Sequence, residues 1–323
     1  MIDTIEIGIS KDFEFDKKGS IWRKTFTRGD TGEVLESYFY NDEVLNINID
    51  GKGLSIKTNL SKLYGLGDNN FYPLGVGAMS IAINETLPRL LDNIGIICDL
   101  DKAKVWRLDL FKNVSLSKPY GVYKDILQTL NLKRTNTRQY PEGYLIGNTL
   151  REVMFYNKVK ELKEKLGFAY VRQLGFNDER IMRGEIRFLK HRENKRNGIE
   201  YLKEIPDKWN SLKEVYSNYM REIFKYDFKG GGELDIDTLK TLINTAMVDL
   251  TIRGKWALEY YGLYPFTFVN KNDLLNALDM HFSRRQVYRI LGDIEKAKKE
   301  YSRRDKDYKR LYDELKNKFT GEG

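Results

Sequence analysis

Apolar and polar residues alternate at every second position through much of the first two-thirds of the sequence, and this pattern gives way to helical spacing after Pro206. Successive side chains of a strand point to opposite faces, so the alternation predicts strands with one face on a core. Gly and Asp turns between these segments indicate antiparallel pairing. The segments expected to be strands are Met1–Ile9, Ile21–Thr27, Val34–Tyr40, Val44–Ile49, Lys104–Phe111, Tyr144–Gly147, Glu152–Tyr156 and Arg180–Leu189.

Helical patterns fill several connections and most of the C-terminal third. Helices are expected at Glu85–Asn93, at Tyr120–Leu130, at Lys158–Leu166 and beyond Pro206, whereas His191–Asn197 is expected to be a charged loop. Three consecutive glycines within Lys229–Gly232 predict a hinge. We therefore predict an α+β fold in which residues 1–205 form an antiparallel-sheet domain with flanking helices and residues 206–323 form a helical C-terminal module.

The charge balance favours a polyanionic partner. The 55 Lys and Arg exceed the 47 Asp and Glu, which gives a net charge of +8 and a pI near 9.1. Nucleic acid is the leading candidate, although a basic protein without such a partner would have the same balance. No segment approaches the roughly 18 apolar residues of a membrane span, so we expect no membrane partner.

Cysteine and histidine are too scarce for several kinds of site. The single cysteine, Cys98, excludes an internal disulfide and a cysteine-based zinc cluster, and it fits a reducing cytoplasm, where we expect the protein. The two histidines, His191 and His281, lie far apart in the sequence, so they cannot form one two-histidine metal motif. Any metal ion must therefore be bound mainly by carboxylates.

Two of the predicted strands each present an acid among arginines. Alternation in Val105–Phe111 places Arg107 and Asp109 together on the face that does not pack on the core. The same arithmetic in Met182–Phe188 groups three charged side chains, namely Arg183, Glu185 and Arg187. A cross-strand salt bridge on a solvated sheet face would explain either segment equally well.

A third segment, Arg151–Lys158, carries Tyr156 where a strand is expected to give way to a helix. A phenol has a pKa of about 10, so a nucleophilic tyrosine needs a nearby cation or metal to stabilise the phenolate. Lys158, two residues further on, could supply that charge. Because the chain has 21 tyrosines, packing or capping is the commoner role for any one of them.

A helix-turn-helix is predicted near the C-terminus. Asn272–Met280 and the segment that follows Ser283, a good N-cap, would form a helix-turn-helix. Its outward side chains suit phosphates and base edges in a major groove, namely Arg284, Arg285, Gln286 and Arg289. The alternative is an ordinary helical hairpin with a basic face. The apolar stripe of the final helix, Glu295–Phe319, favours packing or self-association, which leaves a homo-oligomer open.

The order and approximate spacing of these segments resemble the replication initiators of the filamentous-phage gene II and gene X family. The shared features are Arg-Leu-Asp at 107–109, Phe-Tyr-Asn-Lys at 155–158, Glu-Leu at 161–162, Arg-x-Glu-x-Arg at 183–187, Asn-Phe-Tyr-Pro at 70–73 and the opening Met-Ile-Asp. More distant rolling-circle plasmid initiators show a similar Tyr-x-Lys followed by an acid-and-arginine strand. The resemblance spans most of the chain.

The resemblance implies a nickase that cuts one strand of origin DNA, forms a 5′-phosphotyrosine and leaves a 3′-hydroxyl for a polymerase. It implies Tyr156 as the nucleophile, Lys158 as its companion, and Asp109 and Glu185 as acids that hold Mg²⁺ or Mn²⁺, with a third ligand unidentified. The arginines expected on the DNA are Arg107, Arg183 and Arg187. Origin DNA, a host helicase and a polymerase are the implied partners.

Two other classes of protein stay open. A non-enzymatic DNA-binding regulator of a phage or plasmid would use the basic helices and keep the sheet as a scaffold. A structural or assembly protein would use its tyrosine-rich helices to oligomerise.

Overall fold

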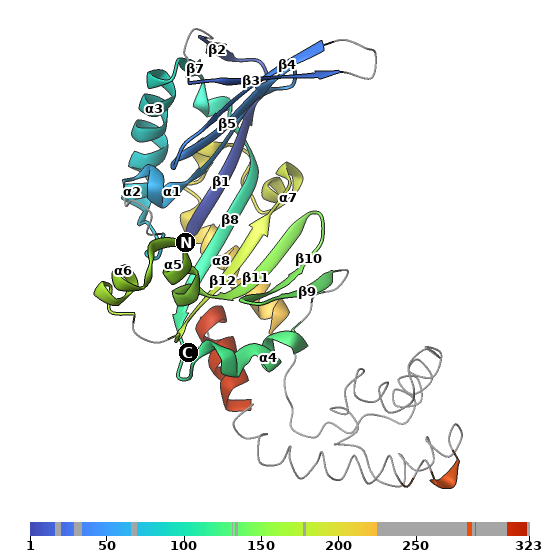
Figure 1. The fold of residues 1–323 in the computed structure, drawn as a ribbon. Helices are drawn as coiled ribbons and strands as arrows, with labels where there is room; N and C mark the ends of the chain where they lie inside the picture. The colour runs from blue at the N-terminus through green and yellow to red at the C-terminus, as the bar shows by residue number, and fades with distance from the viewer. Residues whose placement is uncertain are drawn as a thin grey trace. The chain divides into compact units, whose positions relative to one another are not determined.

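An antiparallel sheet forms the centre of the structure, a computed structural model (Figure 1). It describes residues 1–16, 21–28, 34–65, 70–130, 132, 135–176, 179–224, 283–285, 288 and 309–321. Among these residues, ten strands pair in the order β3-β4-β5-β6-β1-β8-β12-β11-β10-β9, and β2 pairs with β7 in a separate ladder. The α+β prediction with an antiparallel sheet and flanking helices is therefore confirmed.

The large sheet draws its strands from most of the first two hundred residues. They are β1 (Ile2–Ile9), β3 (Arg23–Arg28), β4 (Val34–Asn41), β5 (Leu45–Asp50), β6 (Gly53–Asn59), β8 (Lys104–Ser115), β9 (Asn136–Tyr140), β10 (Gly143–Gly147), β11 (Arg151–Asn157) and β12 (Ile181–Phe188). The small ladder consists of β2 (Phe13–Phe15) and β7 (Ile96–Cys98). The strands β1, β8 and β12 lie at the middle of the large sheet, so their side chains have neighbours on both sides.

Helices occupy the connections and follow the last strand. They are α1 (Leu60–Leu63), α2 (Val76–Ile81), α3 (Leu87–Asn93), α4 (Lys124–Thr129), α5 (Lys158–Leu166), α6 (Phe168–Gln173), α7 (His191–Arg196) and α8 (Trp209–Ile223). A π-helical turn at Ala82–Thr86 joins α2 to α3, and 3₁₀ turns occur at Leu100–Lys102, Tyr120–Tyr123 and Leu202–Glu204. Residues 309–320 are also helical. No helix in these described ranges is both long and apolar enough to cross a membrane.

The apolar face of β11 and β12 packs against α8 and the helical residues 314–320. Phe155 of β11 contacts Phe319, with ring centroids 5.3 Å apart, and Phe319 stacks on Phe224 at 6.1 Å. The hydroxyl of Tyr216 on α8 donates to the carbonyl oxygen of Gly184 at 3.0 Å. A Cβ atom at Gly184 would lie 2.6 Å from the Phe319 ring, so glycine is required there for the ring to fit.

Contacts along the chain divide it into two compact units. Residues 1–225 and 314–323 form one unit, which holds the sheet and α1 to α8, and residues 226–313 form the other. The predicted domain boundary at residue 205 stays a prediction. The predicted hinge at Lys229–Gly232 lies outside the described residues.

The prediction of a charged loop at His191–Asn197 is wrong, because most of this segment forms α7. The Nδ2 atom of Asn194 donates to the carbonyl oxygen of Val105 at 3.1 Å, and Nδ1 of His191 lies 3.1 Å from the same oxygen. Both contacts attach α7 to the strand β8. The polar sequence of His191–Asn197 does not reveal these contacts with Val105, which is distant in sequence.

Candidate functional site

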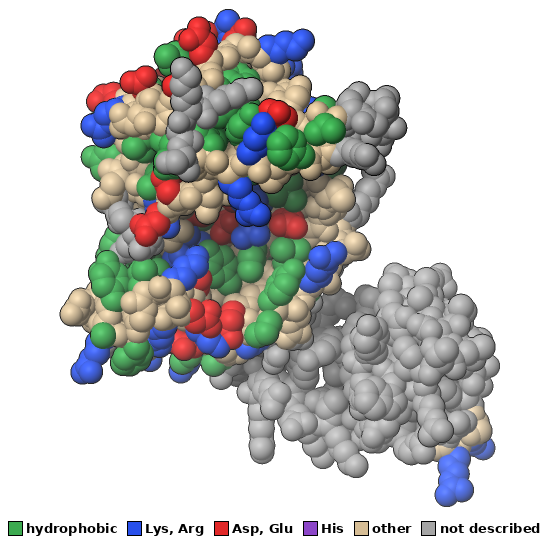
Figure 2. All heavy atoms as spheres, turned by 45° about the horizontal axis from the view of Figure 1, so that its top comes forward, with side chains coloured by type: hydrophobic (Ala, Val, Ile, Leu, Met, Phe, Trp, Pro, Cys, Tyr) green, Lys and Arg blue, Asp and Glu red, His purple; other side chains and the backbone are tan. Residues whose placement is uncertain are grey.

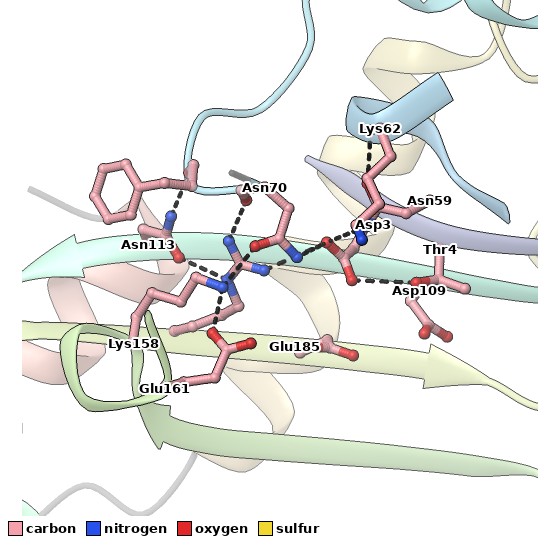
Figure 3. Close-up of polar contacts among 12 residues, drawn as sticks. Asp3, Thr4, Asn59, Lys62, Asn70, Asp109, Asn113, Lys158, Glu161 and Glu185 are labelled. Carbon is pink, nitrogen blue, oxygen red and sulfur yellow. Dashed lines mark hydrogen bonds and ion pairs between the residues drawn. The ribbon is translucent and has the colours of Figure 1, made fainter. Parts of the chain in front are cut away.

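The register of three neighbouring strands places predicted site residues on one face of the sheet. Tyr156 of β11 lies opposite Arg183 of β12, and Arg187 of β12 lies opposite Asp109 of β8. Directly opposed residues project from the same face, and Glu185 shares it because strand side chains alternate. Figure 3 shows Asp109 and Glu185 on these adjacent strands. Figure 2 shows acidic and basic side chains meeting in a hollow of the surface.

Both acids are buried, and each is paired with an arginine of its own strand. The Nε atom of Arg107 donates to Oδ1 of Asp109 at 2.8 Å, and its Nη2 donates to Oδ2 at 2.7 Å. The Nε atom of Arg187 donates to Oε1 of Glu185 at 2.7 Å. Burial raises the pKa of Asp109 to about 7, although Arg107 opposes the rise and the charge of Glu185 adds to it. The two acids therefore form a buried centre in which each carboxylate is matched by an arginine.

Tyr156 lies at the end of β11, directly before the start of α5. The side chain of Asn157 accepts a hydrogen bond from the Lys160 amide at 3.0 Å and so caps that helix. The hydroxyl of Tyr156 donates to Oε2 of Glu185 at 3.2 Å. Burial raises the pKa of Tyr156 well above its usual value, while the charge of Arg183 opposes the rise. The phenol is thus protonated at rest and bonded to a carboxylate that can accept its proton.

Lys158 is fully buried at the first turn of α5. Its Nζ atom donates to Oδ1 of Asn70 at 2.6 Å and forms an ion pair with Glu161 (Figure 3). Burial lowers the pKa of Lys158 to about 8, the charge of Arg183 lowers it further, and Glu161 opposes both effects. At neutral pH this ammonium group keeps most of its charge, and it releases its proton more readily than an exposed lysine does.

Arg183 is fully buried between β8, β12 and the segment that contains Asn70. Its Nε atom donates to Oδ1 of Asn113 at 2.8 Å, and its Nη2 donates to the carbonyl oxygen of Asn70 at 2.5 Å. Its Nη1 lies 3.3 Å from Oδ1 of Asp3, and its guanidinium carbon lies 3.9 Å from the centre of the Phe111 ring. These contacts fix the guanidinium next to the strand that carries Tyr156.

Asp3 of β1 connects several parts of this network. Its Oδ1 atom accepts hydrogen bonds from Asn59 at 3.0 Å and from Asn70 at 2.7 Å (Figure 3). The sequence indicates Asp3 and Asn70 through family resemblance alone, and it does not indicate Asn59 or Asn113. Asn113 could have been found, because it continues the alternation that begins at Arg107.

The two acids offer the oxygen ligands that Mg²⁺ and Mn²⁺ prefer. Mg²⁺ is often held by one or two carboxylates, with phosphate and water oxygens completing its shell. Asp109 and Glu185 fit that pattern as a partial set of ligands. The described part of the chain holds no group of three or more Asp, Glu, His or Cys side chains that could bind an ion alone.

The arginines predicted to contact DNA differ in accessibility. The side chains of Arg107 and Arg187 are 23% and 24% exposed, whereas that of Arg183 has no exposed surface. Arg284 and Arg285 are exposed, and Gln286 and Arg289 lie outside the described residues, as does most of the predicted helix-turn-helix. Contact of these residues with DNA stays a prediction.

Comparison with known proteins agrees with the family suggested by the motifs. Residues 41–220 match the family model for the N-terminal part of the phage replication-associated protein of the gene II type. The matched span contains the strands β8, β11 and β12, with the acids and the tyrosine. No curated protein matches the sequence. The family match covers more than half of the chain, and the chain therefore belongs to the phage family of gene II-type replication-associated proteins.

Proposed function

We propose that the chain initiates rolling-circle replication by nicking one strand of origin DNA with Tyr156. Family membership supports a role in replication initiation and an interaction with DNA. The observation that carries the chemistry is the 3.2 Å hydrogen bond from the Tyr156 hydroxyl to Glu185, on a sheet face that also bears arginines. A hydroxyl next to a base is one of the arrangements that activate a nucleophile.

In the proposed step, the Tyr156 oxygen attacks the phosphorus of a phosphodiester and its proton passes to Oε2 of Glu185. The bond between phosphorus and the 3′ oxygen breaks, and that oxygen takes a proton from a water molecule, whose hydroxide is neutralised by the proton held on Glu185. The products are a 5′-phosphotyrosine on the protein and a free 3′-hydroxyl on the DNA. A host polymerase would extend this hydroxyl, and a host helicase would separate the strands.

The surrounding charges would stabilise this transfer. Arg183 favours the phenolate because its charge opposes the effect of burial on the Tyr156 pKa. Lys158 would stabilise the phenolate or the leaving oxygen. The partly exposed Arg107 and Arg187 would contact the DNA phosphates. Mg²⁺ or Mn²⁺ held by Asp109 and Glu185 would polarise the scissile phosphate and offset its charge.

The test compares Tyr156→Phe with Tyr140→Phe on supercoiled plasmid that carries the replicon's own origin. Tyr140 is 42% exposed on the edge strand β9, so its variant controls for the loss of a tyrosine hydroxyl. With Mg²⁺ or Mn²⁺, wild type and Tyr140→Phe should yield open circles and a covalent protein–DNA adduct. Tyr156→Phe should yield neither, although it should bind the origin like wild type.

Two outcomes would contradict the proposal. Nicking by Tyr156→Phe at the wild-type rate would exclude this tyrosine as the nucleophile. Salt-sensitive origin binding by the wild type, with no strand cut in either metal, would instead indicate a DNA-binding regulator.

A further inference from the structure

A pocket of about 500 Å³ lies at the end of β8, next to the network that holds Arg183. It is lined by the loop at residues 71–73, by the β8 residues 111–115 and by residues of α8. The volume falls within the roughly 300–1,000 Å³ typical of small-ligand sites. The pocket is therefore large enough for a single nucleotide, and nothing in the proposed nicking step uses it.

Aromatic rings and basic side chains give this pocket its chemical character. The rings of Phe71, Tyr72, Phe111 and Tyr216 contribute to its lining, and Tyr72 is 57% exposed. Lys213 of α8 is an exposed cation that also lines it. A flat ring combined with a nearby cation suits a nucleobase and the phosphate attached to it.

Asn113 lines the same pocket, but its amide already has partners in the protein. Its Nδ2 atom donates to the carbonyl oxygen of Phe71 at 2.5 Å, and its Oδ1 accepts from Arg183 at 2.8 Å. A base in the pocket would therefore be held mainly by stacking, which tolerates any of the bases.

The position of the pocket relates it to the proposed nucleophile. Tyr156, Arg183 and Asn113 lie opposite one another on β11, β12 and β8. Neighbouring strands are about 4.8 Å apart, so the backbone at Asn113 lies about 10 Å from the backbone at Tyr156. The segment at Asn70 and Phe71 covers Arg183 and Asn113, so a DNA strand with one phosphate at Tyr156 would cross this segment to bring a nearby nucleotide to the pocket.

A basic path continues from the pocket along α8. A second hollow, of about 330 Å³, shares Lys213 and Ser217 with the pocket and extends to Arg221. This hollow is lined by two cations and one acid, Glu214, so it offers phosphate contacts at Lys213 and Arg221 beside the aromatic pocket, as in proteins that bind single-stranded nucleic acid.

We propose that this pocket holds one unstacked nucleotide of the DNA strand that Tyr156 attacks, with the base against Tyr72 and its phosphate near Lys213. The inference rests on the proposed function for the identity of that strand. It makes Tyr72 a binding residue that orients the DNA and takes no part in bond breaking.

The test measures the binding of overlapping single-stranded oligonucleotides that tile both strands of the origin. All proteins carry Tyr156→Phe, so no strand is cut during the measurement. Tyr72→Ala is compared with Phe26→Ala, which removes an exposed aromatic ring from β3, the edge strand remote from β11. In the tightest-binding oligonucleotide, each base is then removed in turn by an abasic site.

Tyr72→Ala should weaken binding about 5- to 100-fold, as expected for the loss of one stacked base, and Phe26→Ala should leave it nearly unchanged. One abasic position should weaken binding by a similar factor. That abasic site and Tyr72→Ala together should cause no further loss, because they remove the same contact.

Lys213→Gln provides a second measurement, which stands even if Tyr72→Ala fails to fold. It should weaken binding and reduce the slope of affinity against salt by about one counterion. Equal behaviour of Tyr72→Ala and Phe26→Ala, additive losses at every abasic position, or an unchanged salt slope in Lys213→Gln would each overturn the pocket assignment. These measurements report DNA binding alone, so they test the pocket whether or not the protein nicks DNA. A wild-type protein that does not nick would refute the proposed function without changing what the binding data say about the pocket.

Discussion

Tyr156 and Arg183 lie directly opposite each other across the β11–β12 ladder, and Arg183 is held on its other side by Asn113. Burial raises the pKa of the phenol, and the buried guanidinium partly offsets that rise. The same guanidinium contributes to the lowered pKa of Lys158. One fixed positive charge therefore acts on both residues of the Tyr-x-Lys motif.

Arg183→Met should lower the free energy of unfolding by about 3–5 kcal/mol, because the buried Asp3 would lose its counter-charge. Urea denaturation at neutral pH measures the change. Arg221→Met, at an exposed position on α8, should change the same quantity by no more than about 0.5 kcal/mol. Equal effects of the two substitutions would contradict a structural role for the Arg183 network.

Glu185→Gln should slow single-turnover nicking by about 10²- to 10⁴-fold, because the variant lacks the carboxylate that is proposed both to accept the Tyr156 proton and to hold the ion. Origin binding should stay close to wild type. Glu152→Gln is the matched control, since Glu152 lies on the same sheet face 3.6 Å from Arg187. If the two variants nick equally fast, Glu185 is not the base.

Asp109→Asn should raise the Mg²⁺ or Mn²⁺ concentration needed for half-maximal nicking by at least about 10-fold. A chelator should abolish nicking by the wild type, and added ion should restore it. Asp101 has an exposed side chain, and Asp101→Asn should leave the ion concentration needed for half-maximal nicking unchanged. Full activity in the presence of the chelator would rule out the proposed metal.

Gly184→Ala should destabilise the protein by about 1–3 kcal/mol, because the new methyl group would overlap the Phe319 ring. Nicking should fall as well, since Arg183 and Glu185 flank this position. Thermal unfolding and the plasmid assay measure the two effects. Gly121→Ala is the control, because a Cβ atom there meets nothing within 4 Å. Unchanged stability in Gly184→Ala would show that the Phe319 ring moves away at little cost.

We expect Glu314 to make the free energy of unfolding depend on pH in the acid range. Burial alone would raise its pKa, but hydrogen bonds from Lys318, Ser117 and Tyr123 outweigh burial and lower the pKa to about 2. A lowered carboxyl pKa stabilises the folded state above the usual value of 4.5, and this stabilisation is lost as pH falls toward 2.

Glu314→Gln should therefore cost about 1–3 kcal/mol at pH 7 and progressively less below pH 4.5. Urea denaturation of both proteins across this range provides the comparison. A difference that stays constant with pH would show that the charge of Glu314 contributes nothing.

The strands that form the site could be predicted from local pattern. Alternation in Val105–Phe111 and Met182–Phe188 placed Asp109 and Glu185 on the face opposite the core, and both strands form with that orientation. The alternation separates the two faces of each strand in the sequence itself. It did not show that the charged face is also covered, since Asp109, Arg183 and Glu185 are all buried. The pattern gives the face of a residue and does not identify its partners.

Partners distant in sequence could not be predicted. Asp3 and Arg183 form an ion pair although they are 180 residues apart in the sequence. A pattern of neighbouring residues gives no information about such a contact. The strand β9 was missed because all five of its side chains are exposed, so it lacks apolar alternation and is identified only by its backbone pairing with β10. In both cases the determining contacts are made by the folded chain.

The stacking of Phe224 on Phe319 means that the polypeptide leaves the sheet unit and re-enters it at adjoining places. Residues 226–313 are thus inserted into the sheet unit between two points of its chain that lie close together. Proteins commonly tolerate the replacement of a domain inserted in this way. A chain truncated after residue 225 would instead lack Phe319, which packs against β12 at Gly184. The apolar surface left exposed on β12 would promote aggregation of the truncated protein.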